Sequence, residues 1–250
     1  MAVRIRRIKA CLNGRREPAE HPAVPVTPAE LGRAARDAVA AGAEALHIHP
    51  RGGDGLESLR ADDVGAAVAA LRAACPGVPV GVTTGLWAVA DVAERQGLIT
   101  GWAVLDRRQR PDFASVNLSE DGWQELARAL AAAGVAAEAG VWSVDDADQA
   151  ARQPPPGGWL RILVEIPPDQ APDQAEPILA RLAAGGAGGP VLLHGEDGNC
   201  WPLIARAGRL GLPTRIGLED VTAGPSGEPV TGNGELVRLA GAIWDAAAGT

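Results

Sequence analysis

The sequence predicts an α/β fold, a (β/α)8 TIM barrel built by the whole chain, residues 1–250, as a single domain. Short apolar runs alternate with alanine-rich helical stretches from one end to the other, which is the pattern of a parallel sheet with crossover helices. Eight such units in 250 residues fit a closed barrel better than an open doubly wound sheet. The proline- and glycine-rich stretches 153–158 and 185–189 are predicted to be surface turns, so no linker divides the chain.

The eight predicted units follow one another in a regular series. The strand candidates are residues 5–12, 45–49, 78–83, 114–118, 135–141, 160–166, 190–194 and 214–218. The helix candidates are residues 28–41, 61–74, 87–96, 120–133, 144–152, 171–184, 201–211 and 233–247. Because each strand candidate is followed by a helix candidate, the connections are the right-handed crossovers of a parallel sheet.

Local signals mark several of the predicted helix ends. The segment Thr27-Pro28-Ala29-Glu30 has the pattern of a capping box with proline in the first helical turn. Ser119 and Ser143 stand where N-caps are needed, and acidic residues follow each of them. Glycines that can end a helix in the left-handed conformation follow three of the predicted helices: Gly42, Gly134 and Gly211.

The composition argues against several classes of protein. A net charge of −8 does not suit a nucleic-acid-binding protein, which would present a basic face. The three cysteines, Cys11, Cys75 and Cys200, are too scattered for a disulfide framework or a zinc-thiolate site. Lys9 is the only lysine, so no later strand ends in a lysine that could form a Schiff base. No apolar signal core or membrane-spanning run is present, and we expect a cytoplasmic protein with no membrane partner.

Two histidines one residue apart, His47 and His49, stand at the end of the second predicted strand. Alternate residues of a strand share a face, so both imidazoles point the same way. Such a pair could consist of ordinary core or surface histidines, but the chain contains only four histidines. A downstream strand-like stretch ends in the acids Glu219 and Asp220, which can supply a carboxylate ligand. Two imidazoles and one carboxylate make an open zinc site, and we predict one Zn²⁺ per chain.

Polar residues also close or follow other predicted strands: Thr83 and Thr84 after the third, Asn117 after the fourth, Glu138 within the fifth, and His194 and Glu196 after the seventh. Catalytic groups of (β/α)8 barrels lie at the carboxyl ends of the strands. Any one of these residues alone could be a helix cap or a satisfied core group. As a set they predict a polar site, with Thr83, Thr84, Asn117 and His194 as candidate substrate contacts. Alternatively, the His194 side chain could cap the local loop instead of contacting the substrate.

The eighth predicted strand supplies the candidates for proton transfer. Asp220, next to Glu219, is the candidate general base, because a Lewis-acid metal needs a separate base nearby. Arg215 lies four residues before Glu219 on the same face of the strand. Its guanidinium could hold a substrate carboxylate or orient Asp220.

Several of these segments together resemble the β-keto acid cleavage enzymes, the family of the 3-keto-5-aminohexanoate cleavage enzyme. The matching segments are Cys11-Leu12-Asn13-Gly14, Val24-Pro25-Val26-Thr27-Pro28, His47-Ile48-His49, Thr83-Thr84-Gly85, Glu138, Arg215-Ile216-Gly217-Leu218-Glu219-Asp220 and Asn233-Gly234-Glu235-Leu236-Val237. The resemblance runs from about residue 8 to residue 246, nearly the whole of a chain that is shorter than typical members.

The resemblance implies a zinc-dependent barrel that assembles as a homo-oligomer, a dimer or a tetramer. It implies that the enzyme condenses a β-keto acid with acetyl-CoA, giving acetoacetate and a new acyl-CoA through an enolate and a retro-Claisen step. By the same resemblance, His47, His49 and Glu219 would bind zinc, and Asp220, assisted by Arg215, would take the α-proton.

The resemblance also assigns roles to Glu138 and Thr83. Glu138 matches a glutamate of the family on the fifth strand and joins the candidate catalytic residues, and Thr83 matches a hydroxyl position of the substrate pocket. Arg16, in the first loop, is a candidate contact for the CoA phosphates. The segments after the third, fourth, sixth and seventh strands depart from the family's pattern, where acyl-CoA and the substrate side chain are expected.

Two alternatives remain open on the sequence. The first is a zinc-dependent barrel lyase or hydrolase that does not use CoA, and amidohydrolases also place His-x-His on a barrel strand. A binuclear hydrolase would need more histidine ligands than His21 and His194 can supply, so metal stoichiometry separates the two. The second alternative is a barrel that binds a metal or a ligand without catalysis.

Overall fold

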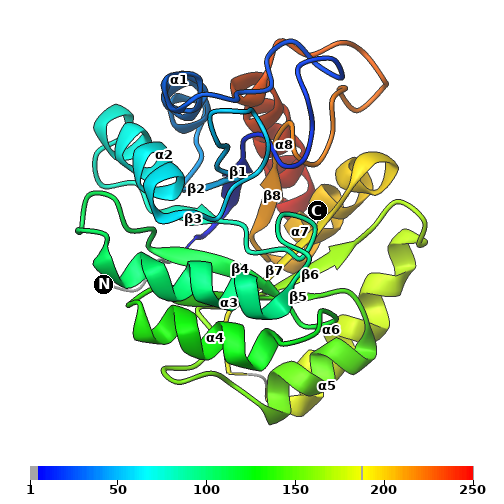
Figure 1. Ribbon diagram of the computed structural model, residues 1–250. Helices are drawn as coiled ribbons and strands as arrows, with labels where there is room; N and C mark the ends of the chain where they lie inside the picture. The colour runs from blue at the N-terminus through cyan, green and yellow to red at the C-terminus, as the bar shows by residue number, and fades with distance from the viewer. Residues whose placement is uncertain (1–4, 187, 250) are drawn as a thin grey trace.

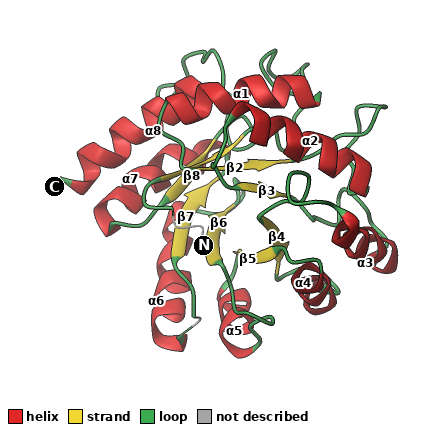
Figure 2. Cartoon of the chain, turned by 90° about the vertical axis from the view of Figure 1, so that its left-hand side faces the viewer, coloured by secondary structure: helices red, strands yellow, loops and turns green. Residues whose placement is uncertain are grey.

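Eight parallel strands form the centre of the molecule in the computed structural model, which describes residues 5–186 and 188–249. The strands are β1 (Ile8–Cys11), β2 (Ala45–Ile48), β3 (Val80–Val82), β4 (Phe113–Asn117), β5 (Ala136–Val141), β6 (Arg161–Ile166), β7 (Val191–Gly195) and β8 (Thr214–Ile216). They lie in the order β7-β6-β5-β4-β3-β2-β1-β8, and every ladder is parallel. Figure 2 shows the strands at the centre and the helices around them.

The two ends of this strand order meet, so the sheet is a nearly closed barrel. The Leu193 N–H donates to the Pro213 carbonyl at 3.0 Å, and the Thr214 hydroxyl donates to the Leu193 carbonyl at 2.8 Å, joining β7 to β8. The predicted (β/α)8 fold is therefore confirmed. No helix of the described residues is long and apolar enough to cross a membrane.

The outer ring contains eight α-helices within the described residues: α1 (Pro28–Ala40), α2 (Ala61–Ala74), α3 (Val92–Gly101), α4 (Trp123–Ala132), α5 (Val144–Arg152), α6 (Ala175–Gly185), α7 (Cys200–Leu210) and α8 (Asn233–Ala248). Short 3-10 turns, Trp102–Val104, Pro172–Gln174 and Asp197–Asn199, follow α3 or precede α6 and α7. α8 packs against both α7 and α1, which closes the ring of helices (Figure 1).

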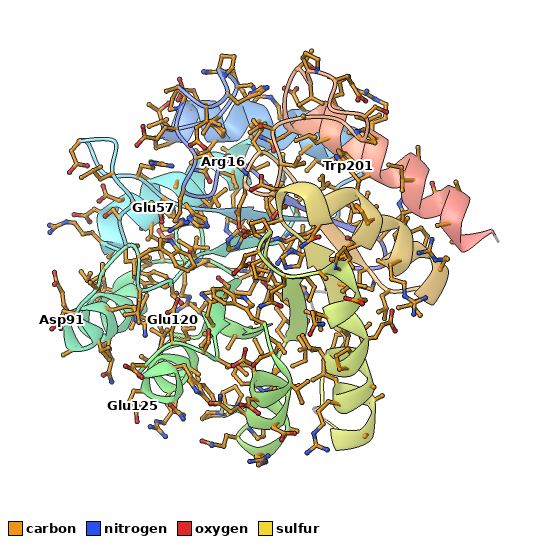
Figure 3. The ribbon with its side chains drawn as sticks, turned by 90° about the vertical axis from the view of Figure 1, so that its right-hand side faces the viewer. Arg16, Glu57, Asp91, Glu120, Glu125 and Trp201 are labelled. Atoms are coloured by element: carbon orange, nitrogen blue, oxygen red, sulfur yellow. The ribbon has the colours of Figure 1, made fainter. Side chains whose placement is uncertain are left out.

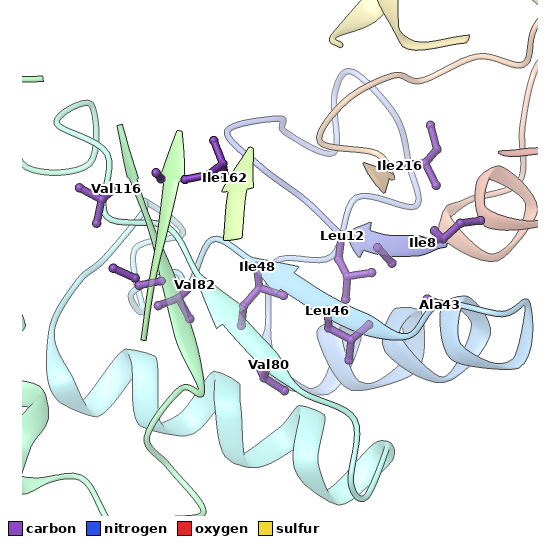
Figure 4. Close-up of a cluster of buried hydrophobic side chains, with 14 of the residues drawn as sticks. Ile8, Leu12, Ala43, Leu46, Ile48, Val80, Val82, Val116, Ile162 and Ile216 are labelled. Carbon is purple, nitrogen blue, oxygen red and sulfur yellow. The ribbon is translucent and has the colours of Figure 1, made fainter. Parts of the chain in front are cut away.

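Alternate residues of each strand face opposite sides, and the two sides have different chemistry. Outward-facing residues such as Ile8, Leu46 and Val82 pack against the helices in the main hydrophobic core (Figure 4). Inward-facing residues include the apolar side chains Phe113 and Leu163, which form a smaller cluster. The polar residues predicted for the site, such as His47, Glu138 and Arg215, also occupy inward-facing positions of their strands. The barrel interior therefore holds apolar, charged and imidazole groups together.

Two of the three predicted N-caps are present in the structure. Thr27 and Glu30 form the predicted capping box of α1, and the Ser143 hydroxyl accepts the Asp146 N–H at the start of α5. The predicted cap at Ser119 is wrong. α4 begins at Trp123, after Gly122, whose φ of 73° is the left-handed conformation that glycine tolerates best.

The third helix begins five residues later than predicted. The segment that contains Trp87 forms an irregular loop, and Asp91 caps α3 by accepting the Glu94 N–H. Trp87 contacts His49 across the mouth of the barrel, and this tertiary contact outweighs the local helical preference. The predicted turn at residues 185–189 is described only in part, because residue 187, like residues 1–4 and 250, lies outside the described residues.

Candidate metal centre and active site

A cavity of about 580 Å³ opens at the carboxyl ends of the strands. Every strand, or the loop that follows it, contributes to its wall. The lining residues are Arg15, Arg16, Glu20, His47, His49, Thr83, Trp87, Ser115, Asn117, Trp142, Leu163, Glu165, Pro167, Pro168, Glu196, Asp197, Arg215 and Glu219. This is the end of the barrel at which enzymes of this fold place their active sites.

His47, His49 and Glu219 converge at one wall of this cavity. The Nε2 atoms of His47 and His49 lie 3.7 Å and 3.6 Å from Glu219 Oε2, and the three potential ligand atoms are within 4.8 Å of one another. The two imidazoles share the inward face at the end of β2, as their spacing predicts. Among the described residues, these three side chains form the one cluster of at least three His, Cys, Asp or Glu groups that are close enough together to hold a metal ion.

The local backbone is built to hold these three side chains. Asn13 accepts the His49 N–H at 2.9 Å and donates to the His49 carbonyl at 2.8 Å, which pins the end of β2 to the loop after β1. Gly14 has a φ of 56°, and a Cβ there would stand 2.5 Å from Glu219 Cγ. Glycine at this position therefore lets Glu219 pack directly on the first loop.

The charges around the triad fit a divalent cation. Burial lowers the pKa of His47 to about 3, so its imidazole is neutral, the form that binds metals. Burial also disfavours the charged form of His49, but Glu219 and Glu57 outweigh it and raise the pKa of His49 to about 9. Glu219 Oε2 is buried and has no hydrogen-bond partner among the described residues. A buried carboxylate oxygen without a donor, faced by two imidazole nitrogens, is satisfied by a bound cation.

Arg215 and Asp220 form an ion pair beside the triad. Arg215 Nε and Nη2 lie 2.9 Å and 2.6 Å from Asp220 Oδ1, and Nη2 lies 3.0 Å from Glu219 Oε1. Burial raises the pKa of Asp220 to about 8, with a further contribution from Glu219, against the lowering effect of Arg215. Asp220 Oδ2 has no hydrogen-bond partner among the described residues. One guanidinium thus contacts one oxygen of each acid and makes no hydrogen bond with Asp220 Oδ2.

The predicted substrate contacts divide into two groups. Thr83, Asn117 and Arg16 line the cavity, and Arg16 is paired with Glu20 at 3.1 Å and with Asp197 at 2.5 Å. Figure 3 labels Arg16 on the loop after β1.

Thr84 and His194 lie outside the cavity lining. The Thr84 hydroxyl donates to the Ser115 carbonyl, which ties the end of β3 to β4. His194 is fully buried within β7 and caps no loop; its Nε2 lies 3.2 Å from Glu165 Oε2.

Two of the three predicted catalytic residues also lie off the cavity wall. Asp220 is fully buried and meets the cavity through its contact with Arg215. Glu138 is fully buried deeper inside the barrel, where it contacts Arg161 and Lys9 Nζ, the latter at 2.8 Å. Lys9 and Arg161 outweigh burial and lower the pKa of Glu138 to about 2, so this carboxylate is charged and already paired.

Several residues of the cavity were not predicted from the sequence. Glu165 follows Leu163 on the inward face of β6, and this alternation was a usable signal for it. Glu196, which follows the seventh strand and belongs to the set predicted from the sequence, also lines the cavity; burial and the neighbouring Glu165 raise the pKa of Glu196 to about 8. Glu57 and Trp87 lie in irregular loops, whose paths no local pattern predicts.

Comparison with known proteins relates these features to a family. The family model described as beta-keto acid cleavage enzyme matches residues 7–249. The apo structure of ObcA has a TM-score of 0.68 at 16% identity, covering 87% of this chain and 61% of that chain. A ternary complex of ObcA with a C4-CoA adduct and oxalate has a TM-score of 0.62 at 16% identity, covering 91% and 62%.

A type I 3-dehydroquinate dehydratase from Clostridium difficile has a TM-score of 0.66 at 11% identity, covering 97% of this chain and 92% of that chain. At these identities the structural likeness shows the fold alone. The chain also spans only 61–62% of the length of the ObcA chains that it matches.

Proposed function

Because the chain belongs to the beta-keto acid cleavage enzyme family, whose model matches residues 7–249, we propose that it cleaves a β-keto acid with acetyl-CoA, giving acetoacetate and a new acyl-CoA. The observation on which this proposal depends is the convergence of His47, His49 and Glu219 beside the Arg215–Asp220 pair at the mouth of the barrel. We further propose that the protein is a cytoplasmic homo-oligomer, a dimer or a tetramer.

His47, His49 and Glu219 would hold one zinc ion per chain. When bound, zinc supplies a Lewis acid that polarises the keto acid and stabilises negative charge on its oxygen. The neutral His47 imidazole and the unpartnered Oε2 of Glu219 suit this ion, and His49 would release a proton when the ion binds. Within the described residues a single such group is found, which favours a mononuclear centre over a binuclear hydrolase.

Asp220 is the proposed base. Arg215 fixes its Oδ1 by two N–H contacts, which leaves Oδ2 to take the proton from C2 of the keto acid, directly or through one water. The resulting carbanion at C2 attacks the acetyl thioester, a C–C bond forms, and the CoA thiolate leaves. The thiolate then attacks the original ketone carbon and the C2–C3 bond breaks. Its electron pair remains on C2, which regains the proton from Asp220 as acetoacetate is formed.

The remaining polar lining supports a substrate with several oxygens. Thr83 follows β3, Ser115 and Asn117 lie on the adjacent β4, and the three offer hydroxyl and amide groups to a carboxylate or ketone. Structures of ObcA with oxaloacetate and with a C4-CoA adduct support a keto acid and a CoA thioester as the substrate classes. Arg15 and Arg16, at the rim, are the candidate contacts for CoA phosphates.

A second candidate function is metal-dependent cleavage of a keto acid without CoA. The observation that favours it is the state of the rim, where Arg16 already pairs with Glu20 and Asp197 and the carboxyl groups of Glu165 and Glu196 face the cavity. Binding of CoA phosphates would require Arg16 to exchange these partners.

The test is to incubate the zinc-loaded protein with a panel of β-keto acids, with and without acetyl-CoA, and to detect acyl-CoA products by mass spectrometry. The proposal expects acyl-CoA and acetoacetate in equal amounts, and none with Asp220→Asn. Consumption of a keto acid at the same rate without acetyl-CoA would favour the second candidate. No consumption of any β-keto acid would refute both.

A further inference from the structure

The imidazoles of His47 and His49 are both buried, but of the two only His49 has a hydrogen-bond partner for its Nδ1 among the described residues. His49 Nε2 faces Glu219, and His49 Nδ1 lies 3.0 Å from Glu57 Oε2. The ring of Trp87 stacks on the His49 ring with a centroid distance of 6.2 Å and an interplanar angle of 12°. By contrast, His47 Nδ1 is buried without a hydrogen-bond partner among the described residues. The surroundings of the two histidines therefore differ in how firmly they fix each ring.

Glu57 joins His49 to Trp87 through one oxygen atom. The same Oε2 that faces His49 Nδ1 accepts the Trp87 Nε1–H at 3.1 Å. Glu57 lies in the loop after β2, where it pairs with Arg51 in an isolated antiparallel bridge, so its backbone is anchored. Its side chain is only 11% exposed. An anchored, largely buried carboxylate with two N–H donors is a defined acceptor rather than a mobile surface group.

Trp87 is held in place although it is 41% exposed. A Cβ at Gly85 would stand 2.3 Å from the Trp87 ring, so the loop leaves space for the indole by having glycine there. The Arg15 guanidinium carbon lies 5.5 Å from the centre of the same ring, within cation–π range. The loops after β1, β2 and β3 thus meet around one histidine. Glu57 is labelled in Figure 3 on its loop beside the barrel mouth.

We propose that Glu57 and Trp87 are positioning residues for His49. Glu57 accepts the Nδ1–H, which fixes the tautomer whose Nε2 lone pair faces His47 and Glu219. Trp87 fixes the plane of the ring and holds Glu57 by its N–H. A metal-binding histidine commonly donates its other ring N–H to a carboxylate in this way, and loss of that acceptor weakens metal binding. The inference rests on the proposed metal centre and adds the two residues that orient one of its ligands.

Zinc affinity, measured with zinc ion alone by competition with a chromogenic chelator, tests the inference. Glu57→Gln should weaken zinc binding by about 10- to 100-fold. Trp87→Phe keeps an aromatic ring but lacks the N–H, so it should bind zinc less tightly than wild type and more tightly than Trp87→Leu. Glu125→Gln on α4 and Trp201→Phe on α7 are matched controls, since they alter an exposed ion pair and another indole N–H outside the cavity. Both controls should bind zinc as wild type does.

A spectroscopic measurement separates positioning from general loss of structure. In zinc-loaded protein with ¹⁵N-labelled histidine, His49 should show a protonated Nδ1, and this signal should shift in Glu57→Gln while the thermal melting temperature of the fold is retained. Zinc affinity within about twofold of wild type in both Glu57→Gln and Trp87→Phe would overturn the inference, as would an equal loss in Trp201→Phe. Absence of zinc binding by the wild type would overturn the metal centre itself. Normal zinc results without turnover of any β-keto acid would refute the proposed function alone.

Discussion

Replacing Glu138 by glutamine distinguishes a structural from a catalytic role for the carboxylate inside the barrel. Glu138 and Lys9 are both fully buried, and Glu138 also accepts a hydrogen bond from Arg161. Glutamine keeps the shape of the side chain but removes the charge that Lys9 faces. Because the cavity lining is unchanged by this substitution, we expect a large loss of stability and, below the unfolding temperature, a small effect on turnover.

The size of the loss follows from the pKa of Glu138. Burial favours the neutral acid, but Lys9 and Arg161 outweigh it and bring the pKa from its usual 4.5 to about 2. A pKa difference of this size corresponds to about 3 kcal/mol of folding free energy at neutral pH. That value agrees with the cost of about 3–5 kcal/mol for removing one partner of a buried ion pair. For a domain of this size the melting temperature should fall by about 6–12 °C.

The pH dependence has a definite sign. A carboxylate whose pKa is lower in the folded state stabilises the protein fully above its unfolded pKa and loses that contribution as the pH falls toward the folded pKa. The difference in unfolding free energy between wild type and Glu138→Gln should therefore be largest above about pH 5 and shrink between pH 4.5 and pH 2. Urea denaturation at several pH values measures it.

Two results would refute this explanation of Glu138. One is a loss below about 1 kcal/mol at pH 7, a value typical of an exposed ion pair. The other is wild-type stability combined with a severe loss of turnover, which would return Glu138 to a catalytic role. Adding Lys9→Met to Glu138→Gln serves as the control, because removing the ammonium should restore part of the lost stability.

Three further predictions concern the cavity. His49→Ala should lose most of the bound zinc by elemental analysis, and an unchanged zinc content would mean that the metal lies elsewhere. Asp220→Asn should keep zinc but lower turnover by about 10²–10⁴-fold, because the amide cannot take a proton; near-normal turnover would exclude Asp220 as the base. Arg215→Lys should be intermediate between wild type and Arg215→Met in turnover of a β-keto acid, since an ammonium cannot reproduce the N–H contacts of the guanidinium with Asp220 and Glu219. Equal turnover in all three proteins would give Arg215 a purely structural role.

The parts of the site that follow strand periodicity could be predicted from the sequence. His47 and His49 share a face because alternate residues of a strand do so, and both stand at the carboxyl end of β2. The closure of the barrel then brings Glu219, which follows β8, to the same wall, because β8 and β2 flank β1. Parity and strand order were sufficient to bring the two histidines and the acids after β8 together, whereas the choice of Glu219 over Asp220 as the third ligand came from the family resemblance.

Depth inside the barrel and the paths of the loops could not be predicted in this way. Glu138 has the inward parity of a site residue, but the stagger between strands sets it opposite Arg161, below the cavity. Trp87 has the local sequence of a helix start, yet contacts with His49 and Glu57 hold it in an irregular loop. Both outcomes depend on distant partners, which local propensity does not encode.

The fate of the carbon atoms tests the proposed reaction most directly. A β-keto acid labelled with ¹³C at C2 is incubated with acetyl-CoA and the zinc-loaded protein, and the products are identified by NMR and mass spectrometry. The proposed exchange predicts labelled acetoacetate, with the label at C2, and an equal amount of unlabelled new acyl-CoA. Label in acetate would indicate hydrolysis, and label in a methyl ketone would indicate decarboxylation. Either result would contradict the proposed transfer to CoA.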